Sequence, residues 1–485
     1  GLASFMKKYV DGKIAGILAI VVGLFAAPIL MASENWDDHD RSDRYLGIDF
    51  ANNYLESCAP NAILFCNGDN DTYPLWYAQN VEGKRTDVRI INMALLPTDW
   101  YSGALLRDVY DSKALPLTVT LDQLRSDRID IIRYADNKIT NQNVYMPLDK
   151  VIKFVLSTES NTYFQGTQTK YLPTKKFKIA VDKAAIKKNK VVMEKDMGSV
   201  VDEILLNYPR TYMSKGDIVL FDFLAQNAKQ GWERPIYFTS TTGSSSFVNL
   251  QAYFQQEGLV HRFVPIKSPL QGSYPTKLAD DILYDNIMND YKWCGVKEKE
   301  NFLLDDKASL VPQTQRELMY RLAMTYVSEA KNKQAQNEQF AQVGSPDGKM
   351  TAETVEANKK VIEANNSKAK NLIQKSLVEM PLNKIPMRAQ LVAYYINVTT
   401  NLGMKEETKA LQDYLIKNAT EYVTWISSMK KKDQTDFLKQ EVGSYLNSLN
   451  TAVQVATQEK QDNAADLKKT LDELNTKFNQ NVSQY

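Results

Sequence analysis

The chain has 485 residues, of which 44% are hydrophobic and 24% are charged, so it is long enough for two or three globular units with separate cores. Lys and Arg number 59, and Asp and Glu number 58. Because this balance gives no overall field that would attract a polyanion, we expect no nucleic-acid partner. The three cysteines, Cys58, Cys66 and Cys294, are too sparse for a disulfide framework or a zinc site.

Residues 14–33 form an apolar run, IAGILAIVVGLFAAPILMAS, without a charged side chain. As a helix this run is about 30 Å long, which matches the hydrocarbon thickness of a bilayer. Three lysines precede it and four acidic residues follow it, so the positive-inside rule places the N-terminus in the cytoplasm and the rest of the chain outside. We predict a transmembrane helix. A signal peptide is the alternative, which the uninterrupted length and the lack of a clear A-x-A site disfavour.

Residues 34–304 alternate between strand-like and helix-like runs. Residues 62–96 hold a strand, a helix and a second strand, which is typical of a βαβ unit with parallel strands and a right-handed crossover. The alternation predicts an α/β fold, a Rossmann-like layered domain with parallel strands. The predicted strands are residues 62–66, 87–96, 117–121, 177–181 and 235–239, and the predicted helices are residues 74–82, 148–156, 197–207 and 218–229.

Residues 305–485 are poor in Gly and Pro and read as amphipathic helices. We expect an antiparallel, TPR-like helical array, although no regular 34-residue consensus is present. The domains predicted from the sequence are therefore 1–33, a cytoplasmic stub and transmembrane helix; 34–304, an extracytoplasmic α/β domain; and 305–485, the helical array. The predicted helices of the array are residues 316–333, 351–379, 387–402, 405–429, 433–450 and 451–478.

The loop NGDNDT, residues 67–72, follows the first predicted strand, where open α/β sheets place ligands. The same residues also suit a turn, because Gly68 is free to adopt a positive φ and Asp71 or Thr72 is placed to cap the next helix. We favour the turn and keep ligand contact as the second interpretation. The run TSTTGSSS, residues 239–246, is likewise either a linker or a loop that binds phosphate or sugar hydroxyls. The candidate ligand-contact residues are Asn67, Asp69, Asn70 and Asp71, with Asp99 and Trp100 at the end of the second strand.

The segment NWDDHDRSDRY, residues 35–45, directly follows the apolar run. Its carboxylates and imidazole are ligand types for a divalent cation, and two of the four groups would serve one ion. The alternative is an interfacial segment in which Trp36 lies at the lipid headgroups and the charges are solvated. No other cofactor is evident. The candidate residues for the membrane interface or a metal are Trp36, Asp37, Asp38, His39 and Asp40.

Histidine-based catalysis has few candidates, because the chain contains only His39 and His261. Neither lies in a Gly-x-Ser-x-Gly or His-Glu-x-x-His context, and we expect His261 to be a strand residue. We assign no catalytic residue.

Three stretches resemble a known family: NWDDHDRSDRY, NAILFCNGDNDTYPLWYAQNVEGKRTDVRIINMALLPTDWY and NAKQGWERPIYFTST, which lie within residues 35–45, 61–101 and 227–241. They resemble the C-terminal half of the bacterial membrane proteins of domain-of-unknown-function family 2723, which are related to the transmembrane-protein-260-like protein O-mannosyltransferases. The resemblance covers roughly residues 34–265. It implies multi-pass enzymes of the glycosyltransferase C class in the bacterial inner membrane, with C-terminal domains in the periplasm.

The same resemblance implies a lipid-linked sugar as donor, a protein or peptide as acceptor, and a catalytic base in an early external loop that would precede residue 1. The chain begins with Gly rather than Met, so we expect it to be the tail of a longer protein. The resemblance implies that the missing part is an N-terminal multi-pass membrane half. Our first hypothesis is the extracytoplasmic portion of a membrane glycosyltransferase that supports or recognises the acceptor. The alternative is a non-enzymatic, membrane-anchored scaffold of the cell envelope. A third is an α/β sugar-binding or hydrolase module that uses Asp69 and Asp71.

Overall fold

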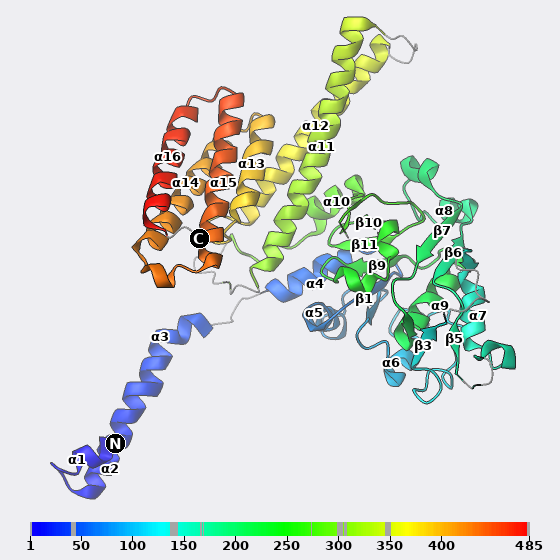
Figure 1. Ribbon diagram of the computed structural model, residues 1–485, viewed down its shortest axis with the longest axis horizontal. Helices are drawn as coiled ribbons and strands as arrows, with labels where there is room; N and C mark the ends of the chain where they lie inside the picture. Colours follow the sequence, from blue (N-terminus) through cyan, green and yellow to red (C-terminus); the bar gives the residue numbers. More distant parts are fainter. Residues whose placement is uncertain are drawn as a thin grey trace.

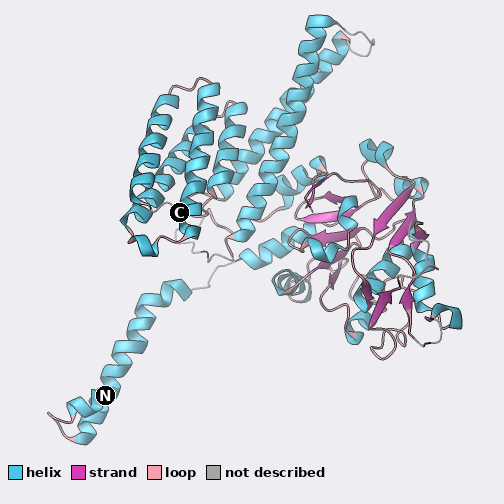
Figure 2. Ribbon diagram, in the orientation of Figure 1, coloured by secondary structure: helices cyan, strands magenta, loops and turns pink. Residues whose placement is uncertain are grey.

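The computed structural model describes residues 2–39, 45–135, 144–164, 167, 169–272, 274–297, 304, 308–344 and 351–482. Three parts follow one another along the chain: an apolar N-terminal helix, a mixed α/β part with several small sheets, and an all-helical array (Figure 1). The colouring by secondary structure in Figure 2 separates the α/β part from the array, because all the strands lie in the former.

The N-terminal helix continues through α2 (Gly12–Leu24), the π-helical turn η1 (Phe25–Ile29) and α3 (Leu30–His39), after the short helix α1 (Leu2–Met6). Pro28 lies inside η1, where a π turn accommodates a residue that has no backbone N–H. The segment Gly12–Trp36 is long and apolar enough to cross a membrane, and almost none of it is buried by the rest of the chain. An exposed apolar helix of this kind is stable in lipid, which indicates membrane anchoring.

The largest sheet has five strands in the order β10-β11-β9-β1-β2. Strands β9, β1 and β2 are parallel to one another. Strand β11 is antiparallel to β9, and β10 at the edge is antiparallel to β11. Helix α5 (Asp69–Asn80) connects β1 to β2, so the predicted βαβ unit within residues 62–96 is confirmed. Its second strand is shorter than predicted. The strands are β1 (Ile63–Cys66), β2 (Arg89–Asn92), β9 (Ile236–Thr239), β10 (Phe254–Gln256) and β11 (Val260–Phe263).

Side chains from successive residues of each strand enter two different cores. Phe65 and Phe238 face a core shared with α7 (Leu148–Leu156) and α9 (Lys215–Lys229). Leu64 and Tyr237 face a second core, which continues through α4 (Leu46–Glu56) and α10 (Asp280–Asp285) into the helical array. Because both faces are covered, the strands are buried at every position, as expected for parallel strands.

Two three-stranded sheets flank the large one, with orders β5-β3-β8 and β4-β6-β7. Residues 177–181 and 235–239 form strands as predicted, and helices α7 and α9 are also confirmed. The remaining elements of this part include α6 (Asp99–Ala104), β3 (Ile131–Tyr134), β4 (Met146–Pro147), β5 (Tyr171–Leu172), β6 (Lys176–Ala180), α8 (Lys183–Lys188), β7 (Glu203–Asn207), β8 (Tyr212–Ser214), β12 (Leu270–Gln271), β13 (Tyr274–Pro275) and the π turn η6 (Asn286–Asp290).

Two predicted elements are wrong. Residues 117–121 are not a strand, because the N–H groups of Thr118 and Val119 donate to the carboxylate of Asp222 (2.6 and 3.0 Å) instead of to a neighbouring strand. Residues 197–207 are not a helix but the 3-10 turn η3 (Glu194–Ser199) followed by β7. In β7 only Ile204 and Leu206 are buried, a period of two that the apolar composition alone does not distinguish from a helix.

The array contains long helices packed side by side, and α11 with α12 projects beyond the others as a hairpin (Figure 1). The predicted limits of α12, α13 and α14 are confirmed to within two residues. The helix break predicted at residue 450 is wrong, because the buried face of α15 continues through Ala452 and Ala456 and the turn comes at Lys460, with φ +51°. The helices are α11 (Leu310–Val343), α12 (Ala352–Glu379), α13 (Ala389–Asn401), α14 (Lys405–Ser428), α15 (Asp436–Gln458) and α16 (Ala464–Asn481).

Candidate functional site

The parallel strands reverse their order between β1 and β9. From β1 the chain crosses through α5 to β2 on one side, and it later returns to β9 on the other side of β1. Such a switch point leaves room between the loops at the carboxyl ends of the two strands, where open sheets bind ligands. The loops here are residues 67–72 after β1 and residues 240–246 after β9, so the structure brings together two of the segments singled out in the sequence.

Asp71 lies between these loops and is only 4% exposed. Its Oδ2 accepts a hydrogen bond from Thr239 Oγ1 (2.8 Å) and a second one from Thr241 Oγ1. The Tyr54 hydroxyl lies 2.9 Å from Thr241 Oγ1 and continues the network into α4. Burial raises the pKa of Asp71, and the two threonine hydrogen bonds oppose that shift. Asp71 therefore joins the start of α5 to the loop after β9.

The prediction that Asp71 or Thr72 caps α5 is wrong. The helix begins at Asp69 with Gly68 as its N-cap, at φ +92°, and no side chain caps it. Thr72 Oγ1 donates instead to the carbonyl of Gly68 (2.7 Å) and accepts from Asn92 Nδ2 (3.0 Å), which links the start of α5 to β2. Asp71 and Thr72, which local spacing assigned to the helix end, thus accept hydrogen bonds from residues of neighbouring strands.

Asn67, Asp69 and Asn70 are exposed at the mouth of the switch point. Asn67 Nδ2 donates to Ser246 Oγ (3.2 Å), so one candidate contacts the serine-rich loop directly. Arg210, which the sequence analysis missed, holds the same loop: its Nη2 donates to the carbonyl of Ser245 (3.2 Å) while its Nη1 pairs with Asp217 (2.9 Å). Asp217, the partner of Arg210, forms a capping box with Ser214 at the start of α9. This pattern is visible in the sequence, but it indicates only the end of a helix.

Asp99 and Trp100 lie at the start of α6. Asp99 accepts from Ser126 Oγ (2.6 Å) and from the ammonium of Lys215, a side chain that is 1% exposed. The hydrogen bond from Lys215 holds the pKa of Asp99 well below its usual range. Asp99 thus ties α6 to α9, while Trp100 is 66% exposed and touches Tyr101 edge-on (5.4 Å between ring centroids).

The membrane-proximal candidates end the N-terminal helix. Trp36 is 76% exposed, as an interfacial anchor requires. Asp37, Asp38 and His39 are the last residues of α3, and Asp40 lies outside the described residues. Within the part of the chain that the structure describes, no group of three or more His, Cys, Asp or Glu residues is placed to hold a metal ion. The divalent cation remains a prediction.

A groove of about 1100 Å³ lies between the sheet and the array. Ser240, Gln256 and His261 line it from the sheet, and Tyr320 and Arg321 line it from α11. His261 lies in β11, which confirms its predicted strand position. Burial lowers the pKa of His261 to about 3, so its ring is neutral at physiological pH.

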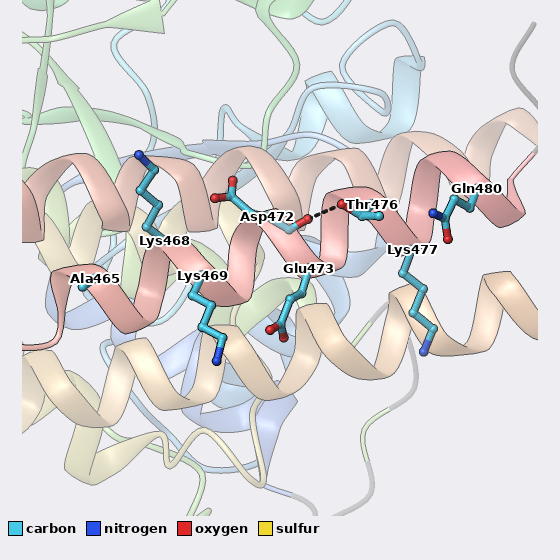
Figure 3. A pocket seen from close by; sticks show the side chains of 8 residues that line it. All are labelled: Ala465, Lys468, Lys469, Asp472, Glu473, Thr476, Lys477 and Gln480. Atoms are coloured by element: carbon cyan, nitrogen blue, oxygen red, sulfur yellow. Dashed lines mark hydrogen bonds between the residues drawn. The ribbon is translucent and has the colours of Figure 1, made fainter.

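A hollow along α16 has a different character (Figure 3). Its side chains come from one helix and carry charges of both signs, among them Lys468, Lys469, Asp472 and Glu473. Thr476 Oγ1 donates to the backbone carbonyl of Asp472 (2.8 Å). Mixed charges on one exposed helix are typical of a solvated surface and suggest no specific chemistry.

Residues 47–281 match the family model of TMEM260-associated domain 2. The match runs from α4 to α10 and includes both loops of the switch point. It fits a TMEM260-like family of membrane proteins, in agreement with the apolar helix that precedes it. No curated protein and no solved structure matches the chain.

Proposed function

We propose that this chain forms the extracytoplasmic portion of a multi-pass membrane glycosyltransferase, which transfers a sugar from a lipid-linked donor to a protein, as in O-mannosylation. The chain contributes acceptor recognition or support, and the catalytic base belongs to a membrane half outside it. In this proposal the protein lies in a bacterial inner membrane, with a Rossmann-like domain of residues 34–304 and a TPR-like array of residues 305–485 in the periplasm.

One observation carries the proposal: the match to TMEM260-associated domain 2 begins shortly after an apolar helix that is long enough to span a membrane. This order keeps the α/β part close to the membrane surface, where a lipid-linked donor presents its sugar. A domain anchored there is well placed to bring a protein acceptor to the donor.

The geometry of the switch point supports a role for its residues in ligand contact rather than in catalysis. The Asp71 carboxylate is buried and already accepts two hydrogen bonds, so it is poorly placed to remove a proton from an acceptor. Asp69 and Asn70 are exposed on the rim and free to meet a ligand's hydroxyl or amide groups. We expect these two residues to affect acceptor or donor affinity rather than the chemical step.

The experiment is glycosyl transfer in membranes from cells that express the full-length gene. We expect an Asp69→Ala/Asn70→Ala variant to lower transfer at least about tenfold, the equivalent of about 1.4 kcal/mol, at an unchanged protein level. Asp466→Ala is the matched control, because Asp466 is also an exposed acidic residue in the first turn of a helix. If glycosyl transfer is proportional to protein level in both variants, Asp69 and Asn70 do not contribute to acceptor or donor binding.

Absence of transfer by the wild-type protein would favour the alternative, a membrane-anchored scaffold. The projecting hairpin of α11 and α12 is the feature that speaks for it, because a protruding pair of helices offers a partner an extended surface (Figure 1).

A further inference from the structure

The groove between the sheet and α11 contains buried polar atoms without partners. His261 is 4% exposed, and its Nδ1 has no hydrogen-bond partner. The hydroxyl oxygen of Ser240 is also buried and unpaired. Both residues line the groove. An unpaired buried group costs about 1–3 kcal/mol, so a small movement of either side chain toward the groove would be favoured by a ligand that supplies the missing hydrogen bond.

The dimensions of the groove fit a single extended chain. Its α11 wall runs from Thr314 to Asn332, about 27 Å at the rise of an α-helix. A volume of about 1100 Å³ over that length gives a cross-section of about 40 Å². One extended polypeptide occupies about 48 Å², the product of the strand and sheet spacings in proteins. The two cross-sections are similar, so the groove matches one chain rather than two, and it is long enough for about eight extended residues.

The lining favours a peptide over a glycan. Apolar side chains lie among the polar ones of the lining: Leu278 lies on the sheet side, and Leu318 and Met324 lie on α11. Sugar sites typically present an open aromatic face, but the ring of Tyr320 is already stacked on Tyr394 (5.3 Å between centroids, 13° between planes). A lining of both apolar and hydrogen-bonding groups suits the side chains and amides of an extended peptide.

The charged side chains that line the groove indicate which peptides it favours. Arg321 lies in the middle of the α11 wall, where its Nη1 donates to Gln256 Oε1 (2.9 Å), so part of its charge is already engaged. Glu317 and Glu329 line the groove on either side of Arg321 along the helix, and both are exposed. The lining therefore has an excess of one negative charge, which favours neutral or basic peptides over acidic ones.

We propose that this groove binds an extended segment of about eight residues from the acceptor protein, with aliphatic side chains and no net negative charge. The proposal rests on the proposed function, because it names the part of the chain that recognises the acceptor. Ser240 and His261 hydrogen-bond to the peptide backbone, and the α11 wall selects its side chains.

The test is direct binding of fluorescent octapeptides to the full chain in detergent micelles. Three synthetic pools, each with a central Thr and alternating aliphatic positions, carry basic, neutral or acidic residues at the remaining positions. We expect the basic and neutral pools to bind and the acidic pool to bind at least about tenfold more weakly. Because the chain has only two histidines, ring-labelled histidine gives a simple NMR spectrum, and the His261 resonance is expected to shift on binding.

Two substitutions on α11 make a matched pair. Ser328→Trp places a large side chain in the groove from an exposed position, and it is expected to weaken peptide binding at least tenfold. Gln336→Trp adds the same side chain at an exposed position of the same helix outside the groove lining, and it is expected to leave binding unchanged. Equal melting temperatures of the two variants would establish that both fold.

Three results would overturn the inference: no pool binds, Ser328→Trp binds as well as the wild type, or mannose oligosaccharides shift the His261 resonance while peptides do not. The assay contains no sugar donor, so it is independent of catalysis. If peptides bind but the full-length protein transfers no sugar, the proposed function is refuted, whereas the inference that the groove binds a peptide is retained. Transfer that is unaffected by Ser328→Trp would refute the groove alone.

Discussion

Two places in the α/β part bury polar side chains, and they differ in how these are satisfied. At the switch point the buried Asp71 carboxylate accepts from Thr239 and Thr241, so the polar groups hold two loops together. In the groove beside α11, His261 Nδ1 and Ser240 Oγ are buried without a partner. A satisfied buried group stabilises the framework, whereas an unsatisfied one costs stability until a further partner supplies its hydrogen bond. The more conspicuous carboxylate therefore belongs to the framework, whereas the histidine lines the groove.

The largest effect should come from the framework of the groove, at the β10–β11 turn. Gly258 has φ +96°, and a Cβ there would overlap with Ser57 Oγ and the Tyr291 hydroxyl. We expect Gly258→Ala to lower the free energy of unfolding by about 3 kcal/mol or more, because strain and overlap add. Thermal unfolding measures it. Gly243→Ala is the control, since Gly243 has φ −63° and open space around it. Equal melting of the Gly258 variant and the wild type would contradict this account of the turn.

At the switch point, Asp71→Ala should cost about 2 kcal/mol of stability, because two hydroxyls lose a charged acceptor. Asp71→Asn keeps an acceptor oxygen and should cost less. The exposed neighbour gives the control: Asp69→Ala should change stability by no more than about 0.5 kcal/mol. Chemical denaturation of the three variants measures the differences. Equal effects at Asp69 and Asp71 would mean that the two carboxylates do not differ as the structure indicates.

Because the His261 ring is neutral in the folded chain, we expect the free energy of unfolding to depend on pH. Its pKa is about 3 in the folded chain because of burial and is about 6.5 when unfolded. Below pH 6.5 the unfolded chain therefore binds a proton that the folded chain does not bind. The contribution of His261 to the free energy of unfolding is thus fully present above pH 6.5 and is lost as the pH falls toward 3. The limiting slope is about 1.4 kcal/mol per pH unit. A His261→Gln variant should lose this dependence. An NMR titration of His261 near pH 6.5 in the folded protein would refute the prediction.

The smallest effect should be the titration of Asp71. Burial raises its folded pKa above the unfolded value of 3.8, so the folded chain holds the proton more tightly than the unfolded chain. The free energy of unfolding should then decrease as the pH rises from 3.8 through the folded pKa. In Asp71→Asn this decrease should be absent, so melting temperatures of variant and wild type should diverge in favour of Asn as the pH rises. Parallel curves would mean that the pKa of Asp71 is not raised.

Local patterns predicted much of the fold. The parallel βαβ unit followed from an apolar run, an Asn-Gly turn and a second apolar run, and three helices of the array followed from their apolar period. The failures came where a distant partner decided the local structure. Asp222 satisfies the backbone at residues 118–119, more than 100 positions earlier, so no strand forms there.

The candidate site shows the same limit. Asn67 and Asp71 were singled out from their position after a strand, and both do lie at the switch point. Their partners Ser246 and Thr239 are more than 160 residues away, so local spacing does not distinguish a carboxylate that holds a loop from one that contacts a ligand.

By itself, the sequence determined the apolar N-terminal helix, the strand-helix-strand unit and the helical C-terminal part, because each depends on composition or on a short period along the chain. Only the tertiary structure decided that Asp71 is buried against Thr239 and that His261 faces a groove completed by Arg321. The physical reason is that hydrogen-bond satisfaction is a property of groups brought together by packing, and the chain order carries no record of which groups will meet.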